Sequence, residues 1–65
     1  MRQLFLNENI KYLIKTGVSI GDEIVLAAKN SALPELDNLI EFSNNTGISI
    51  NDFLFVDIEQ KESLS

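Results

Sequence analysis

Residues 34–55 restrict the fold of this chain more than any other stretch. They include Pro34, the only proline, and Gly47, which separates two stretches of apolar periodicity. Proline suits the first turn of a helix, where its missing N–H has no partner to lose. Glycine suits the residue just beyond a helix, because it adopts the left-handed conformation found there. The segment therefore predicts a helix that starts near Pro34 and is closed by residues 44–47, followed by a further helix capped by Ser49.

The same junction occurs twice along the chain. Thr-Gly-Val-Ser at residues 16–19 returns as Thr-Gly-Ile-Ser at residues 46–49. An N-cap serine with an acid three residues later resembles a capping box, so Ser19 with Asp22 predicts a helix over residues 20–29, as Ser49 with Asp52 does for the last helix. Asn7 is predicted to cap a first helix over residues 7–16. The flanking residues differ, so the two copies do not indicate a repeat architecture.

Apolar periodicity assigns a buried face to each predicted helix. The first face comprises Ile10, Leu13 and Ile14, the second Ile20, Ile24, Ala27 and Ala28, and the third Leu36, Leu39, Ile40 and Ser43 with Phe42 at its edge. Ile48 and Phe53 have the spacing of a hydrophobic staple at the start of the last helix. The sequence thus predicts an all-α fold, a small bundle of about four short helices. One helical domain is expected over residues 1–60, and a flexible tail over residues 61–65.

Composition excludes several classes of protein. The 65 residues include no cysteine and no histidine, so disulfides and thiolate sites are impossible, and a zinc site would need carboxylates alone. The remaining general-base candidates are carboxylates and lysines without a catalytic arrangement, and no glycine-rich phosphate loop is present. We predict a protein that is not an enzyme and uses no cofactor, metal or small-molecule substrate. No apolar run approaches a membrane span or a signal peptide, which predicts a cytoplasmic protein without membrane contact.

The charge distribution disfavours DNA as a partner. The net charge is −5, and between residues 16 and 60 the only base is Lys29. That region also carries eight acids, so it is net −7. DNA binding needs several phosphates neutralised by lysine or arginine, and an acidic body repels a duplex.

Three motifs resemble Cro/repressor-type (XRE-like) helix-turn-helix domains. Asn-Ile-Lys-Tyr-Leu at residues 9–13 is similar to the first helix of that family. Residues 34–43 resemble its fourth helix, and Gly-Ile-Ser-Ile-Asn-Asp-Phe-Leu-Phe at residues 47–55 resembles the turn into its fifth. The resemblance implies a truncated domain of that type, because residues 17–34 are too few for both helix two and the recognition helix. Thr46 also replaces the leucine that is usual in the family.

A second alignment with the family is also open. The Gly-Val-Ser of residues 17–19 then becomes the turn before the recognition helix, and the first helix of the family is missing. This places Leu13 where the family has a small residue and Glu23 where it has a buried aliphatic one. In either alignment the DNA-reading unit is incomplete, and Asp22 and Glu23 stand near the start of the candidate recognition helix, where DNA contacts call for arginine or lysine.

The C-terminal segment contains more apolar residues than one helix face can hold. They are Phe53, Leu54, Phe55, Val56 and Ile58. A helix that is apolar all round is covered on several sides, which predicts a protein-interaction surface here. The family resemblance implies self-association through the same region. The alternative is that Leu4, Phe5 and Leu6 cover the extra face within the chain.

These observations favour a small transcription-regulatory protein that acts through another protein. The expected partner is a repressor-like transcription factor, engaged as a mixed dimer or by acidic surface that takes the place of DNA. That would make the chain an antirepressor or modulator, a role suited to a phage or mobile element. One alternative is a divergent dimeric DNA-binding regulator that uses Arg2, Lys11, Lys15, Lys29 and Asn30. A further alternative is a small inhibitor or immunity-type protein.

Overall fold

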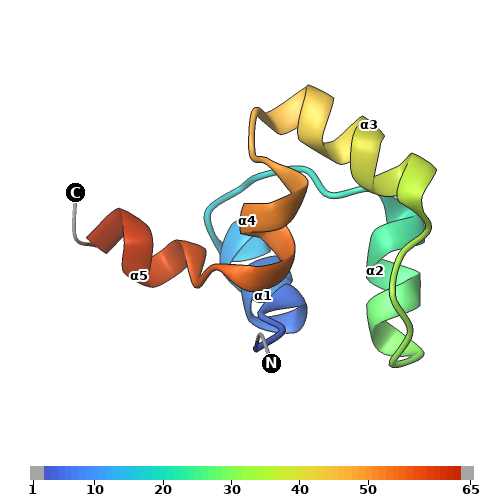
Figure 1. Cartoon of the computed structure of the whole chain (residues 1–65), viewed down its shortest axis with the longest axis horizontal. Helices are drawn as coiled ribbons and strands as arrows, with labels where there is room; N and C mark the ends of the chain where they lie inside the picture. The colour runs from blue at the N-terminus through green and yellow to red at the C-terminus, as the bar shows by residue number, and fades with distance from the viewer. Residues whose placement is uncertain (1–2, 64–65) are drawn as a thin grey trace.

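The computed structural model describes residues 3–63, which form five helices. Figure 1 shows how these helices are arranged. The helices are α1 (Leu6–Lys15), α2 (Asp22–Lys29), α3 (Leu36–Thr46), α4 (Ile50–Phe55) and α5 (Ile58–Ser63). Because the described residues contain no strand, the all-α prediction is confirmed. The predicted last helix is divided in two, which makes five helices where about four were expected. None of the described helices has the length and apolar character needed to cross a bilayer.

The helices are arranged so that α1 lies against both the next helix and the last two. It contacts α2, α4 and α5, while α3 contacts α2 and α4. In Figure 1, α3 bridges the top of the molecule, with α2 descending from one of its ends and α4 from the other. The first and last helices are therefore packed together, and α2 and α3 form an arm that extends away from them.

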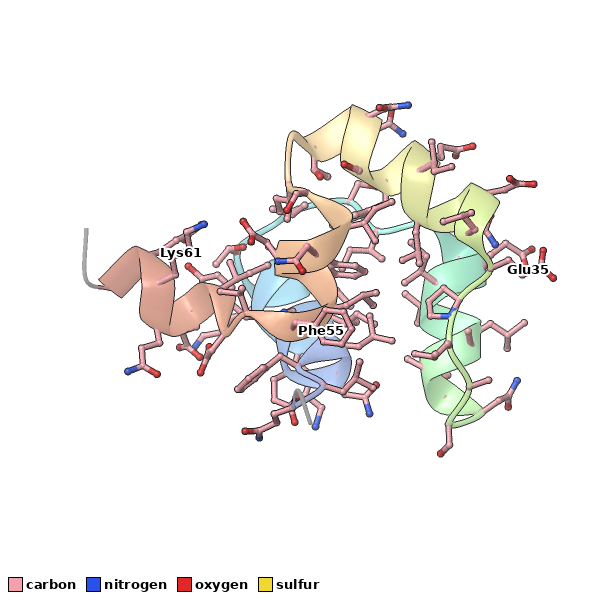
Figure 2. The ribbon with its side chains drawn as sticks, in the orientation of Figure 1. Glu35, Phe55 and Lys61 are labelled. Carbon is pink, nitrogen blue, oxygen red and sulfur yellow. The ribbon has the colours of Figure 1, made fainter. Side chains whose placement is uncertain are left out.

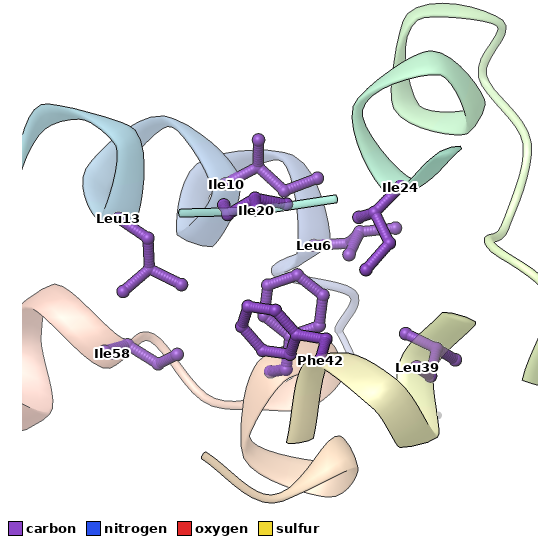
Figure 3. Close-up of a cluster of buried hydrophobic side chains, with 9 residues drawn as sticks. Leu6, Ile10, Leu13, Ile20, Ile24, Leu39, Phe42 and Ile58 are labelled. Atoms are coloured by element: carbon purple, nitrogen blue, oxygen red, sulfur yellow. The ribbon is translucent and has the colours of Figure 1, made fainter. Parts of the chain in front are cut away.

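The core draws side chains from all five helices and from Ile20 before α2 (Figure 3). Its nine buried apolar residues are Leu6, Ile10, Leu13, Ile20, Ile24, Leu39, Phe42, Phe53 and Ile58. Phe53 is fully buried, and its ring stacks on that of Phe42 with centroids 4.1 Å apart and an interplanar angle of 29°. An aromatic pair of this kind adds stabilisation beyond the area that it buries. The pair therefore fixes α3 against α4.

Two helices turn a different face to the core from the one predicted. In α3 the buried residues are Leu39 and Phe42, whereas Leu36 and Ile40 are exposed. The physical reason is the Phe42–Phe53 stack, which orients α3 with Phe42 inward and turns its Leu36–Ile40 side to solvent. In α1 the inward face is formed by Leu6, Asn9, Ile10 and Leu13, so Ile14 is also exposed.

The junction before α4 is built as the sequence predicts. The backbone N–H of Asp52 donates to Ser49 Oγ at 3.1 Å, which makes Ser49 the N-cap. Gly47 ends α3 in the left-handed conformation, with φ of 78°. Ile48 packs against the core that contains Phe53, as a hydrophobic staple requires. The predictions for Ser49 and Gly47 are therefore confirmed.

The starts of the other helices differ from prediction. α1 begins at Leu6, so Asn7 lies inside its first turn rather than at the cap. α2 begins at Asp22 with Gly21 at its N-cap, and Ser19 makes no cap, because the preceding segment stays non-helical while Ile20 enters the core. α3 begins at Leu36, two residues after the proline that was expected in its first turn.

Asn9 joins the two ends of the fold. Its side chain is 1% exposed. Its Nδ2 donates to the carbonyl oxygens of Phe53 at 2.7 Å and Val56 at 2.8 Å, with a longer contact of 3.5 Å to Asp52. Its Oδ1 accepts from the N–H of Ile58 at 3.1 Å. One amide therefore satisfies backbone groups that the end of α4 and the start of α5 leave without helical partners.

The break between α4 and α5 has its own cap. Val56 is extended, with φ of −115° and ψ of 137°, and Asp57 Oδ1 accepts from the N–H of Gln60 at 3.2 Å. Because α5 then continues to Ser63, residues 61–63 are helical, although the sequence assigns them to a flexible tail. The rest of that predicted tail, residues 64–65, lies outside the described residues.

Replacing Asn9 with alanine should lower the free energy of unfolding by about 3 kcal/mol, because it removes a buried amide and leaves buried backbone groups unpaired. A domain of this size is stable by roughly 3–10 kcal/mol, so the loss is a large share of the total. Urea denaturation followed by circular dichroism measures it. Asn7→Ala is the matched control, since Asn7 is exposed on the same helix and should change stability by under about 0.5 kcal/mol. Equal losses in the two variants would contradict the role given to Asn9.

Gly47→Ala should destabilise the protein by about 1 kcal/mol. No atom lies within 4 Å of the added Cβ, so the cost is that of placing an alanine at φ of 78°. Gly21→Ala is the control, because that position is equally open and its φ is −58°, which alanine adopts readily. The control should change stability by under about 0.5 kcal/mol, because alanine is a poorer N-cap than glycine at the start of α2 but also restricts the unfolded chain. Thermal or urea unfolding compares the two, and a Gly21 variant that loses as much as the Gly47 variant would refute this explanation.

Candidate protein-interaction surface

The C-terminal residues predicted to contact a partner are mostly covered by the chain itself. Phe53 and Ile58 belong to the core, so a partner that meets the folded chain cannot reach them. Leu54, Phe55 and Val56 are half-buried, and Leu54 packs against the core. Figure 2 shows Phe55 projecting from the end of α4 toward α2.

Part of this covering comes from the segment that contains Leu4, Phe5 and Leu6, the alternative that the sequence left open. The N–H of Phe5 donates to the carbonyl oxygen of Leu54 at 2.7 Å, and Leu6 is buried in the core. Leu4 remains exposed. The segment before α1 therefore lies along α4 and takes up some of the apolar surface that was assigned to a partner.

The residues named for DNA contact do not gather into one patch. Lys11 and Lys15 are exposed on α1, and Lys29 and Asn30 are exposed where α2 ends. Figure 1 shows the last turn of α2 at the free end of the arm, away from α1. Arg2 lies outside the described residues. Between α1 and α3 the chain forms α2 alone, so it has no pair of helices there for a DNA-reading unit.

Exposed apolar side chains gather on the arm formed by α2 and α3. Six large apolar residues are exposed within residues 3–62, and four of them lie within residues 26–40: Leu26, Leu33, Leu36 and Ile40. Leu36 and Ile40, which we call the α3 stripe, are 64% and 43% exposed and stand one helical turn apart. Full burial of a leucine side chain contributes about 1.5–3 kcal/mol. Burial of the α3 stripe against another protein would therefore stabilise the complex.

A second feature of the arm is a groove of about 610 Å³ between α3 and the start of α2. Its lining comprises Val18, Ser19, Gly21, Asp22, Glu23, Ile24, Asn38, Glu41, Phe42, Asn45, Thr46 and Ile48. In Figure 1 the connection from α1 to α2 passes beside α3 at this place. We call this feature the acidic groove, because three carboxylates and no base line it.

The acidic groove combines charge with an apolar floor. Glu23 on α2 and Glu41 on α3 are exposed on opposite walls, and Asp22 precedes Glu23 at the start of α2. Ile24 and Phe42, which are core residues, form part of the floor. Among the described residues no three acidic side chains are close enough to hold a metal ion. The charge is therefore spread over the walls, which suits an extended cationic group better than a single ion.

Charged and polar side chains also fasten α5 to its neighbours. Lys61 Nζ donates to Asp52 Oδ2 at 2.9 Å, and Figure 2 marks Lys61 on α5. This contact lowers the pKa of the Asp52 carboxyl. Tyr12 on α1 donates its hydroxyl to a Glu62 carboxylate oxygen, and the hydrogen bond raises the pKa of Tyr12. Both contacts join helices, so they stabilise the packing of α5.

The periodicity of the sequence did not identify the arm as a surface. Leu36 and Ile40 were assigned to the core, and Leu26 and Leu33 were not singled out. The exposure of Leu26 could have been predicted from the sequence. Leu26 lies only two residues after Ile24, so it falls outside the helix face that Ile24 shares with Ala28. Glu41 carried no signal, because its place on a groove wall depends on how α3 packs.

Comparison with protein-family models, with curated proteins and with solved structures finds no significant match to this chain. The resemblance to repressor-type domains therefore remains a prediction from its motifs.

The Asp52–Lys61 contact should make stability depend on pH at the acidic end. Because the folded-state pKa of Asp52 is lowered, its contribution is present above the unfolded pKa, near 4, and is lost as pH falls through the folded value. Wild type should therefore lose more stability between about pH 6 and pH 3 than Asp52→Asn does. Urea denaturation at both pH values measures the difference. Lys61→Met should reduce the pH dependence in the same way, and an unchanged dependence in both variants would show that the contact contributes nothing.

Proposed function

We propose that this chain is a small regulatory protein that acts by binding a repressor-like transcription factor, as an antirepressor or modulator. The observation that carries the proposal is the α3 stripe. Leu36 and Ile40 have the spacing of a buried helix face but lie open on the surface. Two further leucines, Leu26 and Leu33, are exposed on the same arm. Exposed apolar side chains that gather in one region are typical of protein-interaction sites.

The charge of the chain favours one kind of partner. Residues 16–60 are net −7, and the α3 stripe lies among acids that include Glu35, Asp37 and Glu41. A protein that binds DNA carries a basic surface. Opposite charge on two proteins speeds their encounter and disfavours partners of like charge. A DNA-binding repressor thus offers the complementary charge, and the helix-turn-helix resemblance supports a partner of the same type.

Direct DNA binding is supported less well by the same residues. Only α2 lies between α1 and α3, and it begins with Asp22 and Glu23. DNA phosphates would repel both carboxylates. The described lysines that could contact DNA are also far apart in the fold, with Lys11 and Lys15 on α1 and Lys29 at the end of α2. Acting on a repressor requires none of these residues to touch DNA. The chain would instead hold the repressor away from its operator.

The test takes helix-turn-helix repressors from the same genome, beginning with any that is encoded beside this chain. Fluorescence anisotropy follows labelled operator DNA bound to each repressor while this protein is added. We expect the DNA to be released by one of them. Leu36→Asp/Ile40→Asp should weaken release at least about tenfold, since charged side chains would replace the apolar contact.

Leu4→Asp/Ile14→Asp is the matched control, because both residues are exposed apolar side chains outside the arm. It should release DNA within about twofold of wild type. Circular dichroism confirms that both doubles stay folded. Two results would sink the proposal: no repressor responds to wild type, or the protein alone binds duplex DNA at micromolar concentration with an affinity that falls as salt is added.

A further inference from the structure

We infer that the acidic groove holds a lysine- or arginine-bearing segment of the protein partner. The inference rests on the proposed function, because it names the chemistry that the partner presents to one part of this chain. The groove volume of about 610 Å³ is within the range of sites that enclose a ligand. It therefore has room for more than one side chain of a docked segment.

The two kinds of surface in the groove match the two parts of a long basic side chain. Lysine and arginine bury an aliphatic stem along apolar surface and keep the charged head at a polar rim. Here Phe42 and Ile48 supply apolar lining, and Glu23 and Glu41 place carboxylates on opposite walls. A neutral apolar segment would leave these carboxylates without partners, and an acidic segment would be repelled.

The remaining polar groups of the groove fit the same occupant. Asn38 and Asn45 on α3 line it, and their amides can bond to a peptide backbone or to a guanidinium. Of the lysines that the structure describes, none lines the groove, so no described base neutralises its carboxylates there. Charge complementarity therefore favours a basic segment over any other peptide.

The acidic groove and the α3 stripe occupy different sides of one helix. Glu41 and Asn45 are one turn apart on the groove side of α3, as Leu36 and Ile40 are on the stripe side. A partner that used both would straddle α3. Because no residue belongs to both surfaces, each can be altered separately.

The probe is a fluorescein-labelled helical peptide of leucine, lysine and alanine, with leucines at helical spacing and lysines elsewhere. Anisotropy at low salt measures its affinity for the full chain. We expect wild type to bind it and Glu23→Lys/Glu41→Lys to bind at least about tenfold more weakly. A peptide with glutamate in place of every lysine should not bind.

The matched control is Glu8→Lys/Asp37→Lys, which changes the net charge by the same amount with exposed acids that do not line the groove. It should stay within about twofold of wild type if binding is local. Equal weakening in the two doubles, or no binding to wild type, would overturn the inference. The peptide could bind while no repressor releases its operator DNA. That result would support the groove as a site for a basic segment and would contradict only the proposed function.

Discussion

The fold depends on one buried amide. Asn9 on α1 donates to the carbonyl oxygens of Phe53 and Val56 and accepts from the N–H of Ile58. The chain between α4 and α5 has to leave its helical path, and the backbone groups that this exposes lie inside the protein. A buried polar group without a partner costs about 1–3 kcal/mol, so apolar packing alone would not make this turn stable. Asn9 satisfies these groups and so permits Phe53 and Ile58 to enter the same core.

Local chemistry made some of this predictable. Ser49 and Gly47 act through their own backbone neighbours, so the sequence identified the junction before α4 correctly. Asn9 acts on residues more than forty positions away, and no local pattern specifies such partners. The sequence offered one indication that Asn9 is buried, because Asn9 lies on the same face of α1 as Leu6 and Leu13. The break before α5 also had one, because Asp57 followed by Gln60 at the third position is a capping pattern.

The orientation of α3 could not be read from periodicity. The helix carries apolar side chains at residues 36, 39, 40 and 42, which is more than the side facing α2 and α4 can cover. Several faces were therefore compatible with burial. The stack of Phe42 on Phe53 decides between them, and it joins elements that the sequence treats separately. The candidate surface follows from that choice, since it turns Leu36 and Ile40 outward and sets Glu41 on a groove wall.

The contact of α1 with α4 and α5 has a consequence for how fast the protein folds. Asn9 bonds to the carbonyl oxygen of Val56 and to the N–H of Ile58, which lie 47 and 49 positions further along the chain. Closing so long a loop costs chain entropy before the buried hydrogen bonds are gained. The separate helices can therefore form quickly, and the joining of α1 to the segment between α4 and α5 is the slower step of folding.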